Sequence, residues 1–581
     1  MLVSVCKSTR MLLVAVASAC NLACAHRSHL ASRCLGVWAL RGPRAMRMAL
    51  APAGSSKRGP TSSSSVGVSR PASSGDARPS IRAGAGARSA AATASGRHGG
   101  SSTSAGKARD WGLPPSLAAK LDTWGDPFVR TVDAARRAWL SAHGCPATWP
   151  SAQQLRVGTD CSGAEAPIWA LRGMGIPHVH VFSCDIEPRV RSFIEATSCP
   201  AGPIYPDMLS RDLASLPACS AYVCGFPCKA FSMLRRHSTQ LLKEKTAKPF
   251  FEVVRVLRHG RPLLAVLENV RGITAALPQI LAKLRDVPGY FVFVVPIDST
   301  HLGEPVSRPR YYFLLVRQDA AVTRDVSSLA ELVKGMYTAA GSSVVDHVSK
   351  RMLPETSAAV KEFTSSLQAR SRKRKARESG SQGVSKSHRP LSPAAPGWAA
   401  HLTPRAQVVI EAAKRKAATR GTADFIVDAS QAEHRANARF DGICPTLTPH
   451  GLVVVGRAAR IIMPIEKLML HGFPVHRMSI PASTLDSVLA SLGGNTMHVK
   501  SVGLALLIGI GLIDWGHGSA RPGAPASQGD SPATPPAVFP LGDITQAAKV
   551  RKRPAKAQPA KGTKRAFGRS GVPAPGRGMA R

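Results

Sequence analysis

Short apolar runs alternate with helix-like stretches from Leu155 onward. Strands are expected at residues 155–161, 178–185, 221–226, 263–270, 290–297 and 311–316, and helices at 168–174, 248–257 and 275–284. This alternation favours a mostly parallel sheet that helices cover on both faces. The pattern therefore predicts an α/β fold, a doubly wound and mostly parallel sheet, whose ligands bind at the carboxyl ends of its strands.

The regularity of the pattern divides the chain into six parts. Residues 1–108 contain a single acid, Asp76, and are rich in Ser, Ala, Gly and Arg, so they cannot bury a core. The other parts are a helical lead-in at 109–153, a core segment at 154–317, an irregular region at 318–439 with a basic, proline-bearing insertion at 369–398, a second core segment at 440–515, and a basic tail at 516–581. One large folded unit is expected.

The net charge of +42 and the pI near 10.8 favour a polyanionic partner, with nucleic acid as the first candidate. Part of this charge lies in solvated tails. The twelve cysteines form no C-x-x-C pair and no zinc-like set, so we expect no metal and a reducing compartment. The apolar run at 502–513 is too short for a membrane helix, which needs about 20 residues, and predicts a buried helix.

The sequence contains two kinds of segment that resemble targeting signals. Residues 11–25 resemble the apolar part of a signal peptide, and the acid-poor stretch after them resembles a transit peptide. Basic runs at 371–377 and 549–569 serve as nuclear addresses, and Met46 or Met48 is an alternative start. We expect a nuclear protein; a plastid or a mitochondrion is the alternative.

Five blocks carry the chemistry, and the first places a cysteine on a turn after a strand. They are VCGFPCKAFS at 223–232, LENV at 267–270, SRPRYYF at 307–313, GFP at 472–474 and GN at 494–495. Pro227 restricts the turn before Cys228, and a thiol presented in this way can act as a nucleophile. In this order the blocks resemble the cytosine-C5 DNA methyltransferases. The resemblance covers residues 154–317 and 440–512 and implies a class I S-adenosylmethionine methyltransferase-like fold.

The resemblance implies a covalent reaction on cytosine in DNA. Cys228 attacks C6 of the base, which raises the electron density at C5, the carbon that accepts the methyl group. Glu268 hydrogen-bonds N3 and neutralises the charge, and Asn269 orients the backbone or the base. Arg310 holds O2, and Arg308 supports the loop or contacts a phosphate. Taken singly, a strand-end glutamate in a salt bridge and an arginine on an edge strand are more common than catalysis.

The cofactor implied is S-adenosyl-L-methionine. The expected contacts are Ser162, Gly163, Glu165, Asp185, Asp207 and Asn495. Asp185, with Glu187 in reserve, follows a strand at the distance typical of a ribose ligand, and its alternative role is to cap a helix. Asp207 is assigned to the adenine amino group, Asn495 to the pocket, and Ser162 or Glu165 to the methionine part.

Some residues depart from the family pattern. Lys229 and Val306 stand where glutamine is usual, and Thr496-Met497 stands where Ala-Val is usual. An RNA-directed relative is one alternative, although the Cys-Phe-Thr segment typical of that group is absent from the sequence. A non-catalytic nucleic-acid-binding relative is another, although it would require the loss of Cys228 or Glu268. We expect a monomer whose target-recognition region lies within 318–439.

Overall fold

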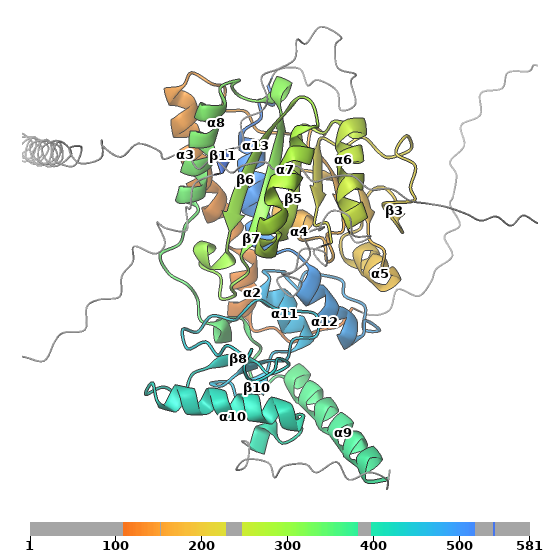
Figure 1. Ribbon diagram of the computed structural model, residues 1–581, viewed down its shortest axis with the longest axis vertical. Coiled ribbons are helices and arrows are strands. Elements are labelled where there is room, and N and C mark those ends of the chain that lie inside the picture. Colours follow the sequence, from red (N-terminus) through yellow and green to blue (C-terminus); the bar gives the residue numbers. More distant parts are fainter. Residues whose placement is uncertain (1–107, 152, 228–246, 381–396, 517–538, 541–581) are drawn as a thin grey trace, which may run out of the picture. The chain divides into compact units, whose positions relative to one another are not determined.

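The computed structural model describes residues 108–151, 153–227, 247–380, 397–516 and 539–540, the last pair and residues 378–380 as backbone only (Figure 1). All of them belong to one compact unit of the chain, Gly99–Arg581. Cys228 and Lys229 lie outside the described residues, as do the segments at 1–107 and 541–581. Within the described residues, no helix is both long and apolar enough to cross a bilayer.

An eight-stranded sheet forms the centre of the core, in the order β11-β6-β7-β5-β4-β1-β2-β3. Its strands are β1 (Arg156–Asp160), β2 (Val179–Cys184), β3 (Ile204–Tyr205), β4 (Ala221–Cys224), β5 (Leu264–Val270), β6 (Tyr290–Ile297), β7 (Arg310–Arg317) and β11 (Phe539–Pro540). Only β7 runs antiparallel to its neighbours β5 and β6; the other pairs are parallel. The expected α/β class and mostly parallel sheet are confirmed.

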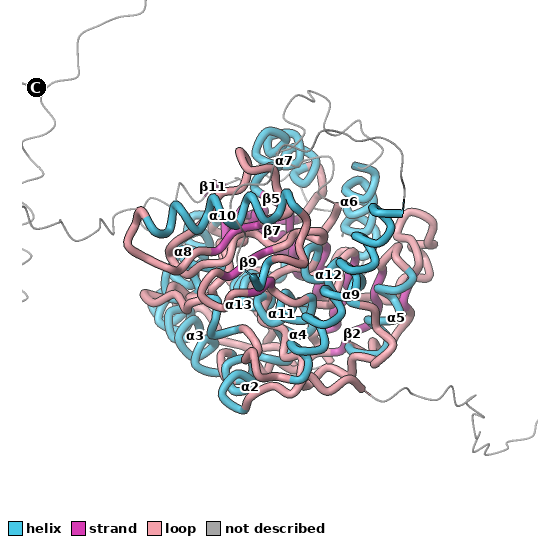
Figure 2. Tube along the Cα trace, turned by 90° about the horizontal axis from the view of Figure 1, so that it is seen from below, coloured by secondary structure: helices cyan, strands magenta, loops and turns pink. Residues whose placement is uncertain are grey.

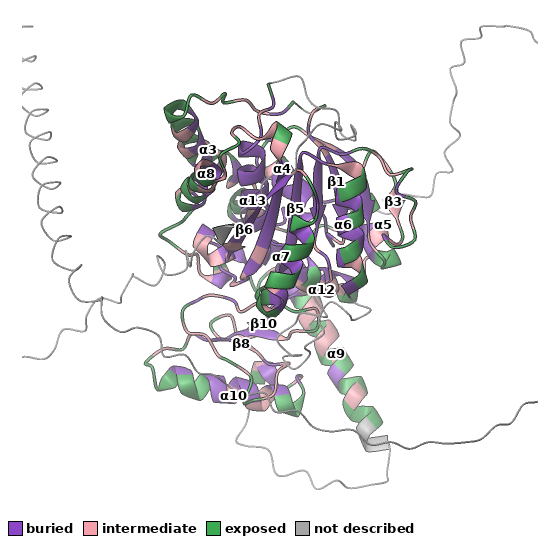
Figure 3. Cartoon of the chain, turned by 45° about the horizontal axis from the view of Figure 1, so that its top comes forward, coloured by how far each residue is buried: buried purple, intermediate pink, exposed green. Residues whose placement is uncertain are grey.

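Helices cover both faces of this sheet because its strands are apolar on both sides. Along β4, Val223 belongs to one buried cluster and Tyr222 to the other. The first cluster takes in α3 (Gly125–Ala142), α4 (Ala166–Gly173), α5 (Pro188–Thr197), α8 (Val326–Ala339), α11 (Pro464–Leu470), α12 (Asp486–Asn495) and α13 (Val499–Gly511); the second takes in α6 (Lys248–Gly260) and α7 (Leu277–Arg285). The strands between them are buried (Figure 3).

The apolar run after Asn495 forms α13, whose residues are almost all buried, as the sequence predicted. It packs against α4 and against β5 and β7, so the second core segment (440–515) packs against the first (154–317). The lead-in also forms helices, α2 (Pro115–Asp122) and α3, of which α3 packs against α8.

The described residues between 358 and 461 form a small subdomain. It contains α9 (Ala358–Gly380), α10 (Pro404–Ala418) and an antiparallel sheet of β8 (Ile426–Asp428), β9 (Val453–Val455) and β10 (Arg460–Ile461). Its own apolar cluster packs α10 on β8 and β9. Seen from below, α9 and α10 lie in front of the sheet (Figure 2). The irregular region expected at 318–439 thus includes α8, which packs on the core, as well as α9 and α10.

Candidate active site

The carboxyl ends of β1, β2, β4 and β5 meet at one edge of the sheet. Asp160, the last residue of β1, lies beside Cys224, the last of β4, and Cys224 lies beside Leu267 of β5. Because parallel strands end at the same edge, the loops after them converge there. The predicted catalytic and cofactor residues follow these strand ends.

Asn269 holds the loop that leads to Cys228. Its side-chain Nδ2 donates a hydrogen bond to the Phe226 carbonyl at 3.0 Å, and its Oδ1 accepts one from the Val270 N–H at 2.9 Å. The side chain is buried, so these bonds compete with little water. Of the two roles expected for Asn269, its contacts fit the orientation of backbone. Pro227 is the last described residue of this loop.

Glu268 and Arg310 form an ion pair between neighbouring strands. Arg310 Nε lies 2.8 Å from Glu268 Oε1, and both residues are 8% exposed. Arg310 begins β7, whose antiparallel register places it beside Val270, so the two side chains extend into the same space. Gly225 borders this space: a Cβ there would lie 3.0 Å from the Cys161 carbonyl oxygen and 2.8 Å from Met497 Cε. Gly225 thus leaves room beside Glu268 that a larger residue would fill.

Arg308 faces the protein interior. Its Nη2 donates hydrogen bonds to the carbonyls of Thr496 at 2.5 Å and Gly494 at 3.3 Å, and its backbone N–H donates to Asp298 Oδ1 at 2.9 Å. The residue is 3% exposed. Of the two roles expected for Arg308, support of a loop fits these contacts, because the guanidinium holds the chain at the end of α12.

The glycine loop after β1 touches that same segment. Gly163 has φ of +66°, and a Cβ there would lie 3.3 Å from Thr496 Cα, so both the conformation and the close approach favour glycine. Thr496 Oγ1 donates to the Ser162 carbonyl at 3.3 Å. Asn495 is exposed, and its Nδ2 bonds Ser491 Oγ at 3.3 Å. Thr496, for which the sequence indicated no role, is therefore the residue that contacts the loop.

Glu165 points inward from the loop rather than towards its rim. Its Oε1 accepts hydrogen bonds from Thr159 Oγ1 at 2.9 Å and Ser183 Oγ at 2.5 Å, and the residue has no exposed surface. Burial raises the pKa of the Glu165 carboxyl to about 7, against the opposing effect of these hydrogen bonds. Glu165 therefore ties the loop to β1 and β2, and these contacts give no support to its expected contact with methionine.

Two carboxylates border the ends of β2 and β3. Asp185 is half-buried, its Oδ1 accepts from the Glu187 N–H at 2.9 Å, and burial raises the pKa of its carboxyl to about 6. Asp207 Oδ1 accepts from the Leu209 N–H at 2.9 Å. In each carboxylate, one oxygen thus accepts a hydrogen bond from the backbone N–H two residues further on, and the other oxygen is the candidate ligand atom. Glu187 is exposed at the start of α5.

A buried ionic cluster behind these acids was not predicted. Asp160 accepts from Tyr222 Oη at 2.6 Å and from both terminal nitrogens of Arg211, with Arg211 Nη1 at 2.7 Å. The guanidinium lies 5.4 Å from the ring centroids of both Phe182 and Tyr205. This arrangement fixes the end of β1 to the chain after β3. A strand-end acid gives no sign of an arginine 51 positions away, so only the fold reveals this pair.

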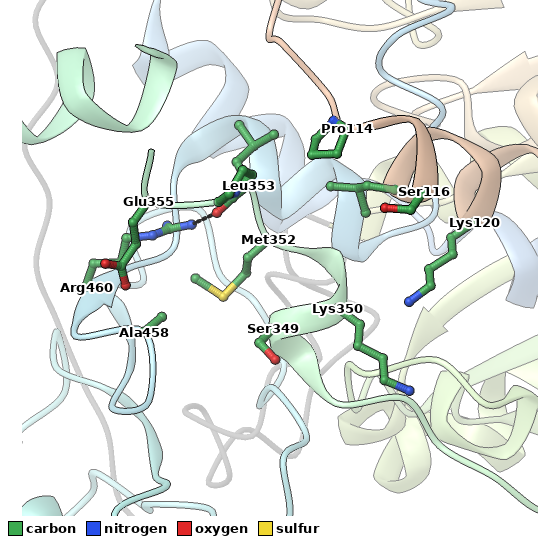
Figure 4. A pocket seen from close by; sticks show the side chains of 12 residues that line it. Pro114, Ser116, Lys120, Ser349, Lys350, Met352, Leu353, Glu355, Ala458 and Arg460 are labelled. Carbon is green, nitrogen blue, oxygen red and sulfur yellow. Dashed lines mark hydrogen bonds between the residues drawn. The ribbon is translucent and has the colours of Figure 1, made fainter. Parts of the chain in front are cut away.

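The cavity shown in Figure 4 lies elsewhere. It has a volume of about 390 Å³ and lies between α2, the short helix η7 (Val348–Arg351) and the turn before β10. Arg460 Nη2 donates to the Leu353 carbonyl at 2.7 Å on its wall. None of the predicted site residues lines this cavity, so the candidate active site remains the edge formed by the strand ends.

A mostly parallel sheet with one antiparallel strand, a glycine loop after β1 and acids after β2 and β3 defines the class I fold of S-adenosylmethionine-dependent methyltransferases. The chain belongs to the C-5 cytosine-specific DNA methylase family, whose model matches residues 161–501.

The relatives found are methyltransferases. The Type II methyltransferase M.BanI of Aneurinibacillus aneurinilyticus is 36% identical over 109 residues, which is 18% of this chain and 25% of that protein. The DNA (cytosine-5-)-methyltransferase DMT5 of Verticillium dahliae is 25% identical over 463 residues, 61% of this chain and 19% of that protein. The chain thus spans a quarter or less of these relatives. A crystal structure of S. pombe Dnmt2 methyltransferase aligns with a TM-score of 0.39 and 15% identity, covering 61% of this chain and 98% of that one.

Proposed function

We propose that this protein transfers a methyl group from S-adenosyl-L-methionine to C5 of cytosine in DNA through a covalent bond between Cys228 and C6. The observation that supports this most is the Glu268–Arg310 ion pair, which lies beside Gly225 in the turn after β4. It brings a carboxylate and a guanidinium together beside Gly225, three residues before the expected nucleophile in the sequence. Membership of the C-5 cytosine-specific DNA methylase family supports the same reaction.

The proposed reaction keeps every atom in balance. The Cys228 sulfur bonds to C6 as a thiolate, and the carboxyl O–H of Glu268 donates a hydrogen bond to N3, where negative charge develops. Arg310 hydrogen-bonds O2 of the base. C5 takes the methyl group that the cofactor supplies, the C5 proton passes to a water molecule, and the C6–S bond breaks to restore the ring double bond and free the thiolate. The target base must leave the duplex first, at a cost of a few kcal/mol.

The residues at the strand ends suit the proposed cofactor. Gly163 gives the loop after β1 its positive φ, and the second oxygens of Asp185 and Asp207 are acceptors for ribose hydroxyls and an adenine amino group. When bound, S-adenosylmethionine supplies the methyl group. Ser162 is the remaining candidate for contact with its methionine part. A nuclear location and a monomeric state belong to the same proposal; the basic runs of the sequence support the first.

A methyl-transfer assay with labelled cofactor tests this proposal. Duplex DNA, RNA and a cytosine-free DNA polymer are offered separately, and label is expected only in DNA that contains cytosine, at C5 after digestion to nucleosides. Label in RNA alone would identify an RNA-directed enzyme. Absence of label from all three, with S-adenosylmethionine bound, would favour a non-catalytic relative.

A further inference from the structure

The second half of α9 is strongly basic. Between Phe363 and Arg377 the sequence contains no acid, and Arg370, Arg372, Lys373 and Arg377 are all exposed. The sequence predicted a low-complexity insertion from 369 onward, whereas the structure has a continuous helix to Gly380. The charges are therefore held at fixed spacing.

One face of α9 is anchored, which leaves the basic face outward. Phe363 packs against both the core cluster and the cluster of the small subdomain, and Leu367 packs against the latter. Further along the same face, Ser371 is 5% exposed and Arg374 Nη2 donates to the Leu402 carbonyl at 3.4 Å. Figure 3 shows exposed residues along the length of α9.

Helix energetics do not account for this charge. In the part of the chain that the structure describes, no carboxylate pairs with Arg370, Arg372, Lys373 or Arg377. Like charges three or four residues apart, such as Arg370 with Lys373 and Lys373 with Arg377, destabilise a helix. The favourable effect of the helix dipole on cations is confined to the last turn, so it reaches Arg377 but not Arg370. A partner that supplies negative charge explains the arrangement better.

The spacing fits a nucleic-acid backbone. Arg370 and Arg377 are seven residues apart, which is about 10 Å along a helix that rises 1.5 Å per residue. One strand of duplex DNA carries a phosphate about every 3.4 Å along its axis, so this length faces about three phosphates of that strand.

We propose that Arg370, Arg372, Lys373 and Arg377 form a binding surface for the phosphate backbone of duplex DNA. The inference rests on the proposed DNA substrate. Such contacts position the protein without reading bases, so they raise affinity equally for all sequences.

Two variants of the full-length protein test the surface. The first, R370Q/R372Q/K373Q/R377Q, removes four charges and keeps a residue that favours helix. The control, K283Q/R285Q/R324Q/K334Q, removes four exposed charges from α7, from the loop after β7 and from α8 of the core. Affinity for duplex DNA is measured against salt concentration for both variants and the wild type, and circular dichroism checks that each is folded.

The slope of log affinity against log salt falls by about 0.9 for each phosphate contact that is lost. We expect the α9 variant to lose about two to four units of slope, the control to keep the wild-type slope, and R370Q/K373Q to lose about half as much. An unchanged slope in a folded α9 variant would overturn the proposal, as would equal losses in both variants. Lost nuclear import with unchanged DNA binding would also overturn it and assign the helix to an import receptor.

This measurement needs no methyl transfer. If the wild type methylates only RNA while the α9 variant still loses duplex affinity, the proposed function fails and the surface stands. If the wild type methylates DNA and the α9 variant binds like the wild type, the surface fails and the function stands.

Discussion

The ion pair between Glu268 and Arg310 holds both side chains in position before the proposed substrate base binds. Their ion pair at 2.8 Å joins the end of β5 to the start of β7, and both side chains are largely buried. Groups already in position lose little freedom when the substrate binds, so more of the interaction energy is available to the transition state. Asn269 holds the carbonyl of Phe226, two residues before the proposed nucleophile in the sequence.

We expect Cys228→Ser to abolish methyl transfer while DNA binding survives, because a hydroxyl is a far weaker nucleophile than a thiolate of nearly the same shape. Wild-type protein should form a denaturation-resistant complex with DNA that contains 5-fluorocytosine, since that base cannot lose its substituent, and the variant should not. Cys199→Ser changes an exposed cysteine and serves as the control. Methylation by the wild type without a trapped complex would refute the covalent step.

Glu268→Gln should mainly reduce catalysis, whereas Asp185→Ala should mainly reduce cofactor binding. Glu268 is proposed to stabilise charge that develops only on attack, so its variant should lose turnover by tenfold or more with little change in cofactor affinity. Asp185→Ala should mainly weaken S-adenosylmethionine binding. Calorimetry gives the affinity and single-turnover assays give the rate. Equal losses of affinity in both variants would contradict these assignments.

At the scale of elements, the six strands expected from apolar runs all form, because burial on both faces leaves a clear signal. Several elements escaped prediction, and two of them show physical reasons. β3 has two residues, too few for a pattern. The narrow apolar stripe of α9 through Phe363 and Leu367 lies in its first half, and the basic composition of the second half is typical of solvated sequence. The Arg211–Asp160 pair and the Thr496–Ser162 contact depend on distant segments, which composition and spacing do not reveal.

Glu165 should make stability depend on pH through the tie between the glycine loop and β2. Burial raises the pKa of this carboxyl from 4.5 to about 7, so the folded state holds the proton more tightly than the unfolded state. The stabilisation is complete below about pH 4.5 and is lost as the pH rises to about 7, by up to about 3 kcal/mol.

Glu165→Gln stays neutral and can still accept both hydrogen bonds. Relative to the wild type, it should therefore gain stability between pH 5 and pH 8 in urea unfolding experiments. Glu331→Gln, at an exposed position of α8, should follow the wild-type curve. Parallel pH dependence of Glu165→Gln and wild type would show that Glu165 is not the responsible group.

At the scale of the whole molecule, more than half of the net charge of +42 lies in residues 1–107 and 517–581. We expect a protein truncated to residues 108–540, which keeps β11 beside β6, to bind all DNA sequences more weakly and with a flatter salt dependence. Its site preference should persist, because base reading is assigned to residues between Arg317 and Pro445. Affinity against salt and sequencing of methylated sites check this. A changed preference would assign base reading to the tails.

The contact of Thr496 with Ser162 has a consequence for biosynthesis. The loop expected to receive the cofactor is completed by a residue 334 positions further along the chain, which Arg308 holds in place. A ribosome makes Cys228 and Glu268 long before it makes Thr496. The nascent chain therefore contains the proposed nucleophile and acid before the proposed cofactor pocket is complete. The proposed methyl transfer therefore has to wait until synthesis has passed α12, and we expect a chain that ends before Thr496 to lack it.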